Sequence, residues 1–152
     1  MPDRHADWLR QARRDLNHAR NAAEDEDYEW SCFAAQQGAK KAVKAVYQRL
    51  GAVAWGHSVT MLLTNLPETY HSPEALVNRA KALDKHYVTT RYPNGFEQGA
   101  LLDYYTRPEA ERSIQDAQAI IHFCEDILAG LAGGEGEAQS RRASDEGAAS
   151  RD

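Results

Sequence analysis

The sequence predicts an all-α protein: an up-and-down helical bundle of four long helices with one short extra helix. Apolar residues recur at steps of three and four along most of the chain, and this spacing places them on one side of a helix. No segment has the alternation of apolar and polar residues that is typical of a strand. The chain has 152 residues, which is enough for one domain with a core of its own.

The first two long helices are expected over residues 4–24 and 28–50, separated by an acidic break that offers a helix cap. The second helix has so wide an apolar face that we expect it at the centre of the bundle, in contact with more than one neighbour. Gly51 is expected to end it in a left-handed conformation. Gly38 lies in its middle, at a cost of about 1 kcal/mol relative to Ala, and close approach of another backbone would explain it.

Ser58 is a good cap for a short helix over residues 59–65. A second cap at Ser72, followed by proline and an acidic residue, predicts the start of the third long helix. We expect this helix to end between Lys85 and Tyr87, because the β-branched residues that follow favour extended backbone.

Residues 95–105 are expected to form a loop. Thr106 and Glu109 then have the spacing of a capping box, and apolar residues follow at the four-three alternation of a bundle seam. The domain is predicted to cover residues 1–131. Residues 132–152 lack large apolar side chains and are predicted to be a disordered tail.

The composition excludes several classes of protein. A net charge of −5 argues against a protein that wraps nucleic acid non-specifically, although a local basic site remains possible. Cys32 and Cys124 fall on apolar helical faces and are interpreted as buried thiols of a reducing cytosol rather than a disulfide or a metal pair. No motif predicts a metal site. No apolar run is long enough to cross a membrane and the N-terminus is not a signal peptide, which predicts a cytoplasmic protein without a membrane partner.

The segment 79–93 is the densest polar stretch of the chain. Arg79 and His86 are seven residues apart, close to two turns, so they share a face if the helix reaches His86. An imidazole can move the proton of a ribose hydroxyl, and a guanidinium can stabilise the charge that builds up on a phosphate. This pair predicts the catalytic residues of a ribonuclease that needs no metal and no cofactor.

The rest of the segment suits contact with a nucleotide or RNA. Lys85 and Arg91 are candidates for holding phosphates, and Tyr87 or Tyr92 for stacking on a base. Asp84 is either part of this binding site or a structural anchor that pairs with Arg91. The residues alone do not choose between these two readings of Asp84.

Three segments of the sequence together resemble HEPN domains (higher-eukaryote and prokaryote nucleotide-binding), in particular the small stand-alone prokaryotic members. They are FAAQQGAKKAVKAV from Phe33, GHSVTMLL from Gly56 and LDKHYVTTRYPNG from Leu83. The resemblance implies a helical bundle that forms a homodimer and is often encoded beside a minimal nucleotidyltransferase. In several such pairs the HEPN protein is an RNA-cleaving toxin, which the transferase neutralises by AMPylating a tyrosine.

Ribonuclease members of the family carry an arginine, four to six residues and a histidine, and Arg79 and His86 are similar with six residues between them. Ala80 stands where Asn is common, and Tyr87 does not keep the His-x-Tyr spacing of the modified tyrosine. Two functions stay open. One is a dimeric ribonuclease toxin that uses Arg79 and His86. The other is a non-catalytic module that binds a nucleotide or a nucleotidyltransferase partner through residues 84–92.

Overall fold

The computed structural model describes residues 2–89 and 96–149, with side chains described as far as residue 133. These residues form helices and turns without a strand, which confirms the all-α prediction. The four long helices are α1 (His5–Glu24), α2 (Tyr28–Leu50), α4 (Glu74–Thr89) and α5 (Arg107–Ala149). The short helix α3 (Val59–Thr64) and two 3₁₀ turns, η1 (Glu68–Tyr70) and η3 (Leu101–Asp103), lie in the connections.

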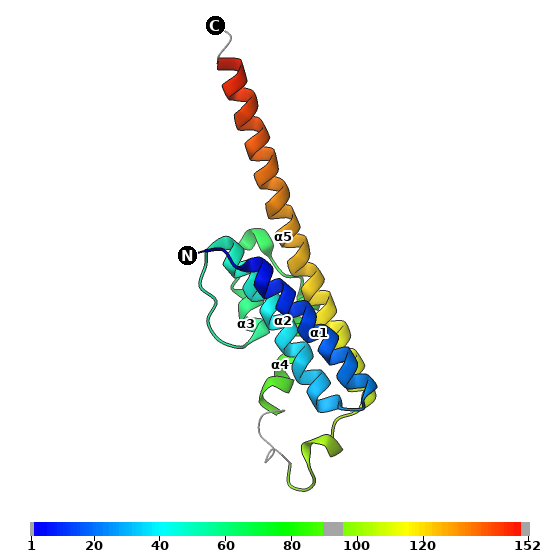
Figure 1. Ribbon diagram of the computed structural model, residues 1–152. Helices are drawn as coiled ribbons and strands as arrows, with labels where there is room; N and C mark the ends of the chain where they lie inside the picture. Colours follow the sequence, from blue (N-terminus) through cyan, green and yellow to red (C-terminus); the bar gives the residue numbers. More distant parts are fainter. Residues whose placement is uncertain (1, 90–95, 150–152) are drawn as a thin grey trace.

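Helix α2 is the central element, as its wide apolar face predicts. It packs against α1, α3, α4 and α5, and Figure 1 shows α1 lying beside it while α3 and α4 occupy its other side. One core cluster draws residues from all five helices. Its largest fully buried apolar side chains are Leu63, Leu83, Ile120, Ile121, Val43, Val46 and Val59.

Gly38 marks the closest approach between α1 and α2. A Cβ atom at this position would lie 3.0 Å from the carbonyl oxygen of Ala12 and 3.4 Å from the amide nitrogen of Leu16. This contact confirms that a neighbouring backbone explains a glycine within the helix. At the end of α2, Gly51 has φ of 69°, the left-handed conformation expected of a helix-ending glycine.

The helix caps agree with the sequence at two of four positions. The cap predicted at Ser72 is wrong, because its buried hydroxyl has no hydrogen-bond partner and α4 begins at Glu74. The Ser58 hydroxyl accepts a hydrogen bond from the Met61 amide at 3.1 Å, and the Thr106 hydroxyl accepts one from the Glu109 amide at 3.4 Å. Asp27 occupies the cap position of α2, but its side chain accepts no helix amide. Helix α2 therefore begins without the side-chain cap that its acidic approach predicts.

Helix α4 is longer than predicted. It continues to Thr89, past the expected end between Lys85 and Tyr87. The Thr89 hydroxyl donates a hydrogen bond to the Lys85 carbonyl oxygen at 2.8 Å, so this side chain satisfies a carbonyl near the helix end despite the poor helix propensity of β-branched residues. The predicted loop over 95–105 also contains the turn η3.

Helix α5 extends beyond the rest of the bundle in Figure 1, as far as Ala149. The disordered tail expected over 132–152 stays a prediction. A helix anchored by packing propagates at low cost, because each added residue gains a hydrogen bond without a new nucleus. Among the described side chains of the helix, Leu128 is the last that belongs to the core, close to the predicted boundary. The division of the chain at residue 131 stays a prediction.

Both cysteines lie in the interior, as predicted, and neither forms a disulfide. Burial raises the pKa of the Cys32 thiol to about 12, and the Ser113 hydroxyl donates to its sulfur at 3.4 Å. Burial also raises the pKa of Cys124. Both groups therefore stay protonated and unreactive at neutral pH. No helix in the described part of the chain combines the length and apolar character needed to cross a membrane.

Candidate functional site

Helix α4 carries the candidate residues, and Arg79 lies on its side that faces α5. The Arg79 guanidinium donates to the carboxylate of Asp116 on α5 at 2.9 Å. The Asp116 side chain is 9% exposed, whereas that of Arg79 is 44% exposed. Burial raises the pKa of Asp116, and the hydrogen bond and charge of Arg79 oppose that rise. Arg79 therefore compensates a buried acid within its own subunit.

His86, two turns further along α4, contacts Tyr105 just before the start of α5. The distance between its Nδ1 atom and the Tyr105 hydroxyl is 3.1 Å, and the two rings are 5.5 Å apart. Tyr105 is buried in a second, smaller core cluster with Cys32 and Ala110. Burial, with a smaller contribution from Lys85, lowers the pKa of His86, so its ring is held neutral at pH 7. Burial raises the pKa of Tyr105 to about 12, so its phenol is neutral as well.

Arg79 and His86 thus occupy one helix and both face the α5 side, as their spacing predicts for a helix that reaches His86. Each has a partner from its own chain, a carboxylate for Arg79 and a phenol for His86. The pairing restrains both side chains. A catalytic role for them stays a prediction.

Asp84 joins α4 to the beginning of α3. Its carboxylate accepts hydrogen bonds from the backbone amides of Val59 and Thr60 at 3.0 and 2.9 Å, and from the Thr60 hydroxyl at 2.6 Å. The Ser58 hydroxyl and the Gln36 amide donate to it as well, each at 3.1 Å. A carboxylate at a helix N-terminus accepts hydrogen bonds from the first amides of the helix and interacts favourably with the helix dipole. The observed role of Asp84 is structural.

Three aromatic rings stack where α2, α4 and the start of α3 meet. The Tyr87 ring stacks with Phe33 and with His57, with ring centroids 6.4 and 5.1 Å away and interplanar angles of 24° and 16°. Phe33 and Tyr87 are half-buried, while His57 is exposed. The Nζ atom of Lys40 lies 6.0 Å from the centre of the Tyr87 ring and 3.4 Å from His57 Nδ1. We call Phe33, Lys40, His57 and Tyr87 the ring cluster.

The ring cluster combines a flat aromatic stack with one amine. The Lys40 side chain is held by the Gln37 amide oxygen at 2.9 Å, and the residue is only 7% exposed. The Gln36 amide donates to the His57 carbonyl oxygen at 2.9 Å, which fixes the backbone below the exposed ring. Stacked rings bind nucleobases, and a fixed ammonium group binds phosphate.

Of the remaining candidate residues, two lie in the described part of the chain and two lie outside it. Lys85 is exposed on α4, and Tyr87 belongs to the ring cluster. Arg91 and Tyr92 lie outside the described residues, and with them the proposed pairing of Asp84 with Arg91. The helical period does not bring Lys40 and His57 together with Tyr87, because the three residues lie far apart in the sequence.

A signal for the ring cluster was nevertheless present in the sequence. The three segments that resemble HEPN domains each contribute to this region. The first supplies Phe33 and Lys40, the second His57, and the third Asp84 and Tyr87. The resemblance is therefore concentrated in residues that meet around one place in the fold.

The fold and this site define a class of small helical-bundle proteins, and comparison with known proteins gives the family. The HEPN domain model matches residues 5–127. The chain belongs to the HEPN family.

Solved structures and a curated relative agree with this assignment. A crystal structure of TT1696 from Thermus thermophilus has a TM-score of 0.80 and 48% identity over 82% of this chain and 98% of that one. The crystal structure of ST0689, an archaeal HEPN homologue, has a TM-score of 0.72 and 38% identity over 84% of this chain and 99% of that one. A Methanocaldococcus jannaschii protein named "Putative toxin MJ1304" is 27% identical over 130 residues, which cover 80% of this chain and 86% of that protein.

Proposed function

We propose that this HEPN protein is the toxin-type member of a pair with a minimal nucleotidyltransferase, and that it binds a nucleotide unit at the ring cluster. The observation that carries the proposal is the stack of Phe33, Tyr87 and His57 beside the amine of Lys40. The name of the M. jannaschii relative supports the toxin class. The nucleotidyltransferase partner is what the family resemblance implies.

The chemistry of the site favours a base with its phosphate. A base that stacks on the exposed face of His57 extends the existing ring stack by one layer, and such contacts are worth about 1–3 kcal/mol per base. The phosphate then lies within reach of Lys40. Lys85 is exposed on the same helix as Tyr87 and adds a second positive charge. Asp84 acts indirectly, because it holds the start of α3 beneath His57.

The ring cluster is tested with His57→Ala, since His57 is exposed and its loss leaves the core intact. Binding of AMP and of a fluorescent RNA of about four nucleotides is measured by calorimetry and anisotropy. The affinity of the variant is expected to fall about 5- to 100-fold, the equivalent of one lost stack. His122→Ala, another exposed histidine, is the control. Equal affinity of His57→Ala and wild type would overturn the site.

The two ligands also separate the possible sources of the nucleotide. Binding of AMP as tight as that of the short RNA identifies a free nucleotide as the ligand. Binding of RNA alone identifies a nucleic-acid chain. Failure of both ligands to bind would reject the proposed function.

The pairing with a nucleotidyltransferase has a separate test. Expression of the chain alone in a bacterial host is expected to slow growth, and co-expression of a cognate minimal nucleotidyltransferase is expected to restore it. Co-expression of a catalytically inactive transferase shows whether growth is restored by binding of the transferase or by modification of the HEPN protein. Unchanged growth in both conditions would contradict the toxin class, whatever the ring cluster binds.

A second candidate function, a metal-independent ribonuclease, is favoured by the arrangement of Arg79 and His86 on one side of α4. The neutral His86 ring is oriented through Nδ1 by Tyr105, the arrangement of a histidine prepared for proton transfer. A homodimer would bring two such pairs together. Expression of wild type and His86→Ala in a host without the transferase tests this function. Equal growth and equal RNA integrity, with the variant shown to be folded by its melting curve, would rule it out.

A further inference from the structure

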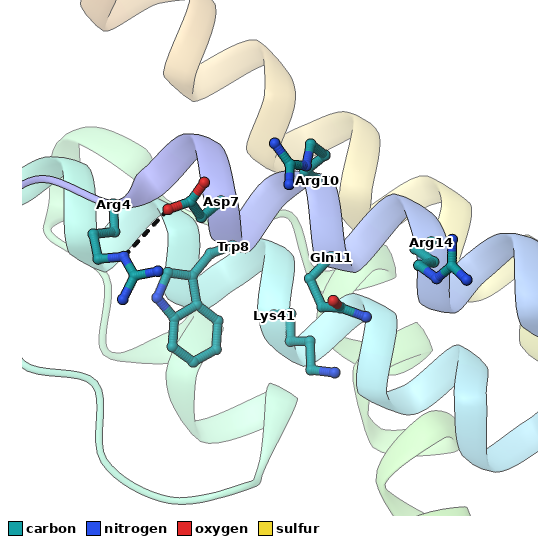
Figure 2. Close-up of a pocket in the computed structure, with 7 residues that line it drawn as sticks. All are labelled: Arg4, Asp7, Trp8, Arg10, Gln11, Arg14 and Lys41. Atoms are coloured by element: carbon teal, nitrogen blue, oxygen red, sulfur yellow. Dashed lines mark hydrogen bonds and ion pairs between the residues drawn. The ribbon is translucent and has the colours of Figure 1, made fainter.

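A second cationic surface lies along the first turns of α1. A hollow of about 780 Å³ is lined mainly by residues of α1 and by one residue of α2. Figure 2 shows these lining residues. Its charged and aromatic lining residues are Arg4, Asp7, Trp8, Arg10, Arg14 and Lys41. Four cations against one acid stand out in a chain whose net charge is −5. We call this surface the α1 hollow.

Lys41 pairs with the half-buried carboxylate of Asp15 at 2.6 Å, so an anion in the α1 hollow would be bound by the three arginines. Arg4 pairs with Asp7 at 3.2 Å, but both side chains are more than half exposed, and such pairs are weak and readily exchanged. Arg10 and Arg14 are exposed and form no ion pair with an acid in the described part of the chain. One turn of helix separates them, which is the spacing of neighbours on one face.

Trp8 adds an aromatic surface to the α1 hollow. Its residue is half-buried against the core, so the indole is fixed, and the Nζ atom of Lys44 lies 5.9 Å from its ring. Figure 2 shows the indole beside Arg4, on the side of α1 that meets α2. A fixed indole surrounded by cations suits a nucleobase attached to phosphates.

The α1 hollow is linked to the ring cluster along α2 by shared lining residues. Lys41 lines it and also lines a second hollow of about 280 Å³ together with Gln37 and Phe33. Phe33 in turn stacks on Tyr87. Residues 33, 37, 41 and 44 are three or four apart, so they follow one face of α2. From Phe33 to Lys44 this face is about 16 Å long at the rise of an α-helix.

We propose that single-stranded RNA follows this face of α2. One base stacks on the ring cluster, and the phosphates of the RNA backbone bind Arg10 and Arg14 in the α1 hollow. The ring-cluster end of this path rests on the proposed function. Unpaired bases are required, because aromatic rings lie at both ends and stacking needs exposed base faces. An acidic protein partner would bind the arginines, but it would not use the fixed indole of Trp8.

The test compares labelled, unstructured RNAs of about 4 and about 12 nucleotides by anisotropy at about 50 and 200 mM salt. Wild type is expected to bind the longer RNA at least tenfold more tightly. Arg10→Ala with Arg14→Ala is expected to remove this advantage and to lower the slope of log affinity against log salt by about 1.4, the value for two lost phosphate contacts. Trp8→Phe is expected to keep more of the preference for the longer RNA than Trp8→Ala does.

The matched control is Arg20→Ala with Lys81→Ala, which removes the same charge from exposed positions outside the path. An equal loss of affinity in this control would overturn the path, since it would show attraction by net charge only. A long RNA that binds no better than a short one, with His57→Ala still impairing the short one, would overturn the path and leave the proposed function standing. Long RNA that binds through the arginines while short RNA does not bind would reject the ring cluster and retain the α1 hollow.

Discussion

The Asp84 carboxylate shows how one residue can hold a site together without belonging to it. It accepts five hydrogen bonds, three of them from Val59 and Thr60 at the start of α3. His57, the exposed ring of the cluster, lies directly before the cap of this helix. The position of the ring therefore depends on a carboxylate of α4.

Replacement of Asp84 by Ala is expected to lower the free energy of unfolding by about 2–3 kcal/mol. The change leaves the first amides of α3 without their acceptor, and each unsatisfied group in a half-buried setting costs about 1–3 kcal/mol. Urea unfolding gives the measurement. Asp126→Ala, an exposed acid on α5, is the control and should change stability by less than about 0.5 kcal/mol. A loss of less than about 0.5 kcal/mol for Asp84→Ala would show that Asp84 does not stabilise the start of α3.

His86 makes the stability of the protein depend on pH. Its pKa in the folded protein lies below the ordinary value of 6.5, because burial penalises the charged ring. Below pH 6.5 the unfolded chain therefore binds more protons than the folded one. The contribution of His86 is complete above pH 6.5 and is lost as the pH falls below it.

Between pH 7 and 5.5, wild type is expected to lose more stability than His86→Gln, whose side chain does not titrate. The difference in slope has an upper limit of about 1.4 kcal/mol per pH unit, the value for one proton. Asp116, whose pKa is raised by burial, acts in the opposite sense and is common to both proteins. Parallel curves of unfolding free energy against pH would show that His86 is not the group responsible.

At the scale of the elements, the contact between α1 and α2 decides how closely the ring cluster and the α1 hollow can approach. Gly38 permits the contact, since its neighbours are backbone atoms of Ala12 and Leu16 that cannot rotate away. Because Phe33, Lys40 and Lys41 are on the same helix, a change in this packing moves residues of both surfaces.

Gly38→Ala is expected to destabilise the protein by about 1–3 kcal/mol, because overpacking outweighs the gain of about 1 kcal/mol in helix propensity. Gly130→Ala on α5 separates the two effects. A Cβ atom at Gly130 has nothing within 4 Å, so this variant is expected to gain up to about 1 kcal/mol. Thermal unfolding of both variants gives the comparison. Equal stabilisation of both would mean that α1 and α2 can separate at no cost.

At the scale of the whole molecule, α5 completes the core and then continues alone. Its residues as far as Leu128 belong to the main cluster, and Asp116 and Tyr105, which hold Arg79 and His86, lie on or just before it. One helix thus closes the bundle and restrains the α4 residues that are candidates for catalysis.

A chain that ends at Ala132 is expected to have the stability of the full-length protein within about 0.5 kcal/mol, because the removed segment lacks large apolar side chains and the core side chains described on α5 end at Leu128. Differential scanning calorimetry of both chains measures the effect. A large fall in melting temperature would place part of the segment 133–152 within the folded domain.

The sequence by itself determined the number of helices, most of their bounds, the central place of α2 and the purpose of Gly38. These features follow from the helical period, from caps and from single glycines, all of which act over a few neighbouring residues. The end of α4 was predicted too early, because the propensity of Val88 and Thr89 was weighed without the hydrogen bond that Thr89 makes.

Only the tertiary structure decided what the polar residues of α4 do. Asp84 bonds to α3, Arg79 and His86 pair with Asp116 and Tyr105, and Tyr87 stacks with a ring from each of two distant segments. The partners are 19 to 54 residues away in sequence, so no local pattern encodes them. Periodicity places a side chain on a face of its helix, whereas packing alone determines which side chain it meets there.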